Sequence, residues 1–129
     1  MKILHLEDSQ LDHVIAQKAM LESNTACSWT RVETLDQFAT HSSSCQVDLV
    51  LADYQLPGFT ALDAWNAFPK IGDRPPFVLF SGAIGEAAAV AAIHLGFADY
   101  LSKSEHSKLG RVVCRALEFD RSIKDKAAT

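Results

Sequence analysis

Acidic side chains follow short hydrophobic segments at two points of the chain. The segment 3–6 runs directly into Glu7 and Asp8, two adjacent carboxylates that repel each other. The apolar segment 47–52 runs directly into Asp53. If these three carboxylates share a small space, either their pKa values rise or a cation joins them. Their hard oxygen ligands favour Mg²⁺ over softer metals.

A hydroxyl and an ammonium group stand in similar places further along the chain. Ser81 ends an apolar segment at an expected helix entry, beside the backbone N–H groups of Gly82 and Ala83. Lys103 follows another apolar segment and adds a mobile positive charge. Such groups can stabilise a phosphoryl group on a carboxylate. Asp53, the lone acid after an apolar segment, is the expected nucleophile.

Short apolar segments alternate with helical patterns along the chain, which places these residues in a fold. The expected strands are 3–6, 27–32, 47–52, 77–80 and 98–101. Helices are expected to begin at Ser9 and Thr34, each with a capping-box pattern, and the run 42–44 is expected to be a loop. The alternation predicts an α/β doubly wound sheet, in which ligands bind beyond the carboxyl ends of the strands. The candidate residues therefore converge at one edge.

Composition limits the alternatives. The chain has 129 residues, a formal net charge of -4 and 22% charged residues, which predicts one domain spanning 1–129 and no nucleic-acid partner. Residues 120–129 are expected to form a C-terminal helical extension or linker. No stretch is long and apolar enough for a membrane span, so no membrane partner is expected. Three widely spaced cysteines indicate neither a zinc site nor a disulfide framework, and favour a cytoplasmic protein.

The sequence resembles a response-regulator receiver domain of two-component phosphorelay signalling over nearly its whole length. The stretches that carry the resemblance are VDLVLADYQLPG, FVLFSG, LPGFTALDA, SGAIGEAAAV and ADYLSK, together with the adjacent acids of KILHLEDSQ. The resemblance implies a flavodoxin-like, five-stranded parallel sheet of order 2-1-3-4-5, with five helices on both faces. It also implies a signalling domain rather than an enzyme, which contributes to its own phosphotransfer and dephosphorylation chemistry.

The resemblance further implies a phospho-acceptor and a metal site. Asp53 is expected to accept a phosphoryl group from a phosphohistidine donor, which is a histidine kinase or a histidine phosphotransfer protein. Asp8 and Asp53 are expected to bind Mg²⁺ directly, and Glu7 mainly through water. The backbone carbonyl of Gln55 is a further expected ligand. The expected output partner is a downstream effector protein or a fused signalling module.

The same resemblance implies how a signal leaves the site. Ser81, Lys103 and the backbone at Gly82 and Ala83 are expected to contact the phosphoryl oxygens. Tyr100 stands at the position of the aromatic switch residue, and Ser81 is expected to work with it. The surface expected to change is formed by the fourth helix, the fifth strand and the fifth helix.

Two departures from the family pattern and three rival functions bear on this interpretation. Ser104 stands where receivers usually have a proline after the lysine, so the Lys103–Ser104 peptide is predicted to be trans, because a non-proline cis bond costs ~3 kcal/mol. Ser81 replaces the more frequent threonine. The main alternative is a degenerate receiver that binds partners without phosphorylation. A haloacid dehalogenase-type phosphatase would need an acid where Gln55 stands, and no glycine-rich phosphate loop supports a nucleotide-binding module.

Overall fold

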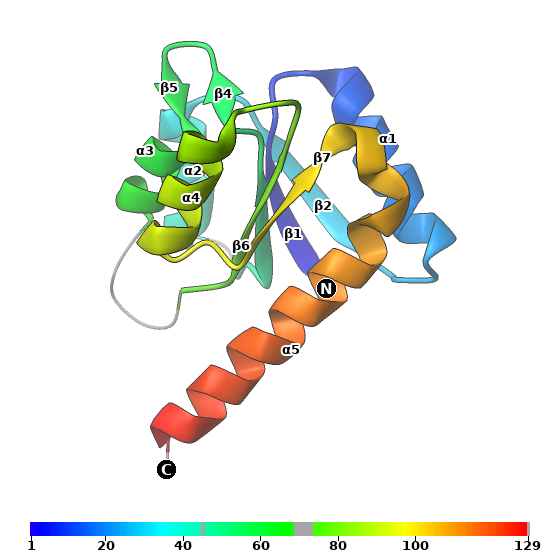
Figure 1. Cartoon of the computed structure of the whole chain (residues 1–129), viewed down its shortest axis with the longest axis vertical. Helices are drawn as coiled ribbons and strands as arrows, with labels where there is room; N and C mark the ends of the chain where they lie inside the picture. Colours follow the sequence, from blue (N-terminus) through cyan, green and yellow to red (C-terminus); the bar gives the residue numbers. More distant parts are fainter. Residues whose placement is uncertain (45, 69–73, 129) are drawn as a thin grey trace.

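The computed structural model describes residues 1–44, 46–68 and 74–128, and shows one parallel sheet between two layers of helices (Figure 1). The sheet has the order β2-β1-β3-β6-β7, and every neighbouring pair is parallel. Its strands are β1 (Lys2–Leu6), β2 (Ser28–Val32), β3 (Leu49–Ala52), β6 (Phe77–Ser81) and β7 (Asp99–Ser102). Counted along the chain, this is the predicted order 2-1-3-4-5, so the fold prediction is confirmed.

Helices cover both faces of the sheet, as the doubly wound pattern predicts. Helices α1 (Gln10–Glu22) and α5 (Leu109–Ala128) lie on one face. The opposite face carries α2 (Leu35–Ser44), α3 (Ala61–Ala67) and α4 (Glu86–Leu95) (Figure 1). A short 3₁₀ helix, η1 (Lys103–Lys108), joins β7 to α5. A two-stranded hairpin, β4 (Gln55–Leu56) with β5 (Phe59–Thr60), follows β3 and was not expected from the sequence.

Two hydrophobic cores explain why the strands read as nearly continuous apolar runs. Alternate residues of a strand point to opposite faces. Leu4 and Val50 therefore enter the core beneath α2, α3 and α4, whereas Ile3 and Leu51 enter the core beneath α1 and α5. All four side chains are almost fully buried. A parallel sheet covered on both faces needs this pattern.

The helix ends differ in part from the expected caps. The Ser9 hydroxyl accepts a hydrogen bond from the Asp12 amide at 3.2 Å, but the Asp12 carboxylate does not return to Ser9 and contacts Lys103 instead. The expected loop at 42–44 is wrong, because these serines form the last turn of α2. Their hydroxyls donate to backbone carbonyls three or four residues earlier, which lets serine remain within a helix.

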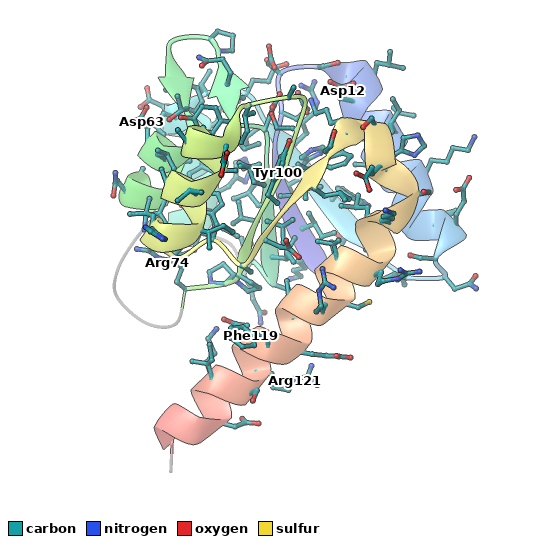
Figure 2. All side chains as sticks on the ribbon, viewed as in Figure 1. Asp12, Asp63, Arg74, Tyr100, Phe119 and Arg121 are labelled. Atoms are coloured by element: carbon teal, nitrogen blue, oxygen red, sulfur yellow. The ribbon has the colours of Figure 1, made fainter. Side chains whose placement is uncertain are left out.

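Helix α5 continues well past the end of the sheet and includes most of 120–129 (Figure 1). Phe119, labelled on this projecting part in Figure 2, is 63% exposed. Among the described residues, no helix is long and apolar enough to span a membrane.

Candidate functional site at the carboxyl edge of the sheet

Backbone hydrogen bonds carry the strand ladder past the ends of β1 and β3 and fix two acids. The Glu7 amide donates to the Val32 carbonyl at 3.0 Å, and the Asp53 amide donates to the Leu6 carbonyl at 3.0 Å. Both residues therefore stand at the carboxyl edge of the sheet in neighbouring strands. Carboxylate oxygens of Glu7, Asp8 and Asp53 all lie within 4.8 Å of one another.

The Asp53 carboxylate lies between a hydroxyl and an ammonium group. Ser81 Oγ donates a hydrogen bond to Asp53 Oδ1 at 2.5 Å. Lys103 Nζ donates to Asp53 Oδ2 at 3.1 Å. The Ser81 oxygen also accepts a hydrogen bond from the Tyr54 amide at 3.3 Å, which restrains its position. With 13% of its side chain exposed, Asp53 remains open to a small reactant.

Lys103 holds the acids together electrostatically. Its ammonium lies 2.7 Å from Glu7 Oε1, 2.7 Å from Asp12 Oδ2 and 3.1 Å from Asp53 Oδ2. Partial burial lowers the pKa of Lys103, but its contacts with the three carboxylates outweigh that effect and raise the pKa above its usual value. The lysine is therefore a fixed positive charge at neutral pH.

The charged form of Glu7 is destabilised, because its side chain is fully buried. Burial, reinforced by the charge of Asp53, raises the pKa of Glu7 to about 7, although Lys103 opposes this rise. Oε2 accepts a hydrogen bond from the Ser9 amide at 3.2 Å. Oε1 meets Lys103 as an ion pair but receives no hydrogen bond of normal geometry from the described residues. Such an oxygen, beside two more carboxylates, fits a divalent cation or its bound water.

Comparison with known proteins decides the family. The family model of the response regulator receiver domain matches residues 3–113. The chain belongs to this family. A comparison with curated proteins finds no significant match.

Solved structures support the same fold. A response regulator from Hahella chejuensis shares 18% identity, with a TM-score of 0.75 over 92% of this chain and 93% of that one. A CheY-like receiver domain protein from Methanospirillum hungatei shares 14% identity, with a TM-score of 0.77 over 94% and 96%. NtrX from Brucella abortus gives a TM-score of 0.84 at 22% identity, over 98% of this receiver domain but 29% of that longer chain.

The remaining residues expected at the receiver site lie around its rim. Gln55 is exposed on β4, and its side-chain amide donates to the Leu56 carbonyl. Gly82 and Ala83 are exposed in the loop after β6. Tyr100 is half-buried, and its hydroxyl donates to the Gly82 carbonyl at 2.9 Å. This hydrogen bond links Gly82, the residue after Ser81, directly to β7.

One site residue, Asp12, was not predicted from the sequence, because its spacing from Ser9 matched a capping box. It lies at the upper end of α1, at the edge where the strands end (Figure 2). Helix spacing gave no signal for it, because Asp8 precedes α1 and its N-cap Ser9, so the two acids do not share a helix face. The Lys103–Ser104 peptide is trans, as predicted, and the described residues contain no cis peptide bond.

Proposed function

We propose that this receiver domain accepts a phosphoryl group on Asp53 from a phosphohistidine donor, with Mg²⁺ as cofactor. The donor would be a histidine kinase or a histidine phosphotransfer protein in the cytoplasm. The output would pass to an effector protein or a fused signalling module. One observation carries the proposal: Asp53 is held between the Ser81 hydroxyl and the Lys103 ammonium, beside Glu7 and Asp8.

The geometry supports nucleophilic attack by Asp53 on phosphorus. An Asp53 oxygen would form the new O–P bond while the P–N bond to the donor histidine breaks, and the departing imidazole keeps the P–N electron pair and takes a proton from solvent. Ser81 and Lys103 already contact the two carboxylate oxygens, so they are placed to hydrogen-bond the transferred oxygens. Preorganised donors of this kind stabilise the charge that develops during transfer.

The cation site would lie at Glu7, Asp8 and Asp53, with the Gln55 carbonyl as a further candidate ligand. Bound Mg²⁺ would neutralise phosphoryl charge near these carboxylates. Glu7 supports this role because its buried Oε1 has an ion-pair contact but no aligned hydrogen bond among the described residues. Release of the phosphoryl group by water would be slow, because Gln55 cannot act as a general acid or base.

The switch would start at Ser81. A phosphoryl group on Asp53 would draw the Ser81 hydroxyl toward it and move the attached Gly82. Because the Tyr100 hydroxyl donates a hydrogen bond to the Gly82 carbonyl, this movement would displace Tyr100 on β7. The surface formed by α4, β7 and α5 would change with it. One or two charge-assisted hydrogen bonds, each ~1.5–3 kcal/mol, are enough to shift a balanced equilibrium.

The test is mass measurement after incubation with Mg²⁺ and a small phosphodonor such as acetyl phosphate. The wild type should gain one phosphoryl group that is labile to acid and alkali, whereas Asp53→Asn should gain none. An unchanged wild-type mass would instead favour the degenerate receiver. Continuous release of inorganic phosphate without a stable adduct would favour a hydrolase.

A further inference from the structure

Asp12 is an acid at the site to which the proposed function assigns no role. Its Oδ2 lies 2.7 Å from Lys103 Nζ, closer than the 3.1 Å that separates Lys103 from Asp53. The contact joins the first turn of α1 to the start of η1, across 91 positions of sequence. The Asp12 side chain is 31% exposed, so the ion pair is partly shielded from solvent.

The position of Asp12 is fixed by a short chain of hydrogen bonds that begins at the acidic cluster. The Ser9 amide donates to Glu7 Oε2 at 3.2 Å. The Ser9 hydroxyl in turn accepts from the Asp12 amide at 3.2 Å. An acid in the first turn of a helix is also favoured by the helix dipole. These hydrogen bonds therefore fix the backbone of Asp12 relative to the Glu7 carboxylate before any reactant binds.

Lys103 has three N–H donors, and three carboxylates surround them. Two of these carboxylates, Glu7 and Asp53, belong to the cluster suited to a cation, and Asp53 is also the proposed acceptor. A cation bound there would compete with the ammonium for both carboxylates and weaken their attraction for it. Asp12 lies outside that cluster, so its attraction for Lys103 would persist.

We infer that Asp12 is a positioning residue, which holds the Lys103 ammonium at the site while Glu7 and Asp53 are engaged. The inference rests on the proposed function. Lysine has a flexible stem, and Lys103 is 20% exposed, so without Asp12 the ammonium can turn toward solvent. Phosphoryl transfer to Asp53 then loses a preorganised positive charge. Asp12 touches Lys103 rather than the reacting atoms, so it acts through the lysine.

The test compares Asp12→Asn with Asp12→Glu and with a matched control, Asp36→Asn. Asp36 is an exposed acid in the first turn of α2, so its substitution removes the same charge from an equivalent place on another helix. Two quantities are measured at saturating Mg²⁺: the rate of phosphoryl uptake from acetyl phosphate, and the affinity for beryllofluoride as a phosphoryl mimic. Asp12→Asn should lower both about tenfold, as expected for loss of one charge-assisted hydrogen bond.

Asp12→Glu should recover most of the loss, and Asp36→Asn should change each quantity less than about twofold. A readout independent of transfer is the NMR signal of the Lys103 ammonium without Mg²⁺. Asp12→Asn should shift or broaden this signal, and Asp36→Asn should leave it unchanged. An Asp12→Asn protein that takes up phosphoryl and binds the mimic like the wild type would overturn the inference.

A double-mutant cycle separates action through Lys103 from a structural effect of α1. In a Lys103→Ala background, Asp12→Asn should reduce uptake no further, because the group it positions is absent. An equal, additive loss in both backgrounds would overturn the positioning role. Failure of the proposed function looks different, because the wild type itself would then gain no phosphoryl group.

Discussion

Replacing the buried Glu7 by glutamine should remove a loss of stability that the wild type undergoes as the pH rises from 4.5 to about 7. Burial and the neighbouring Asp53 charge raise the pKa of Glu7 from 4.5 to about 7. The folded protein therefore binds more protons than the unfolded chain between these values, and the free energy of unfolding falls as pH rises through that window. The difference in pKa corresponds to ~3 kcal/mol at 1.36 kcal/mol per pH unit. Glu7→Gln is neutral throughout and escapes this loss.

The assay is urea unfolding followed by circular dichroism, with a chelator present, at several pH values from 4.5 to 8. The stability of Glu7→Gln relative to the wild type should grow by ~3 kcal/mol across this range. Glu118→Gln replaces an exposed glutamate on α5, and its stability relative to the wild type should stay within about 0.5 kcal/mol at every pH. A difference between Glu7→Gln and the wild type that does not vary with pH would refute the reasoning.

Three further predictions concern packing, metal and signal. Gly96→Ala should destabilise the fold by ~1–3 kcal/mol in urea unfolding, because the residue has φ +130° and an added Cβ would lie 2.7 Å from the Trp65 ring; a loss below about 0.5 kcal/mol would contradict this. Asp8→Ala should bind Mg²⁺ at least about tenfold more weakly by titration calorimetry, and unchanged binding would place the metal elsewhere. Ser81→Ala should weaken the NMR shift changes that beryllofluoride and Mg²⁺ cause at Tyr100; changes of full size would exclude the switch proposed above.

The fold could be predicted because its sequence signals are spread over many residues. Strands buried on both faces must be apolar throughout, and the five segments expected from the sequence match the five observed strands to within two residues at each end. Three of the acids were placed together for the same reason, since the parallel order fixes which strand ends are neighbours. Neither prediction depended on a single contact.

Features that depend on one side chain were harder to predict. Strands β4 and β5 have two residues each, too few for a periodic pattern. Asp12 fits both a helix cap and an ion pair, and the choice depends on Lys103, 91 positions away. His5 is fully buried, and its Nδ1 lies 2.8 Å from His13 Nδ1. No spacing rule connects these two histidines, because one lies on a strand and the other on the helix above it.

The distances along the chain between partners at the site have a consequence for folding. The hydrogen bonds of the site join residues 28, 50 and 91 positions apart. Contacts of such long range form late, because the closure of long loops costs entropy before the contact repays it. A partly folded chain, or one still being synthesised before Lys103 has emerged, has the acid but not its ammonium partner. The proposed acceptor site is therefore complete only when the whole sheet has assembled.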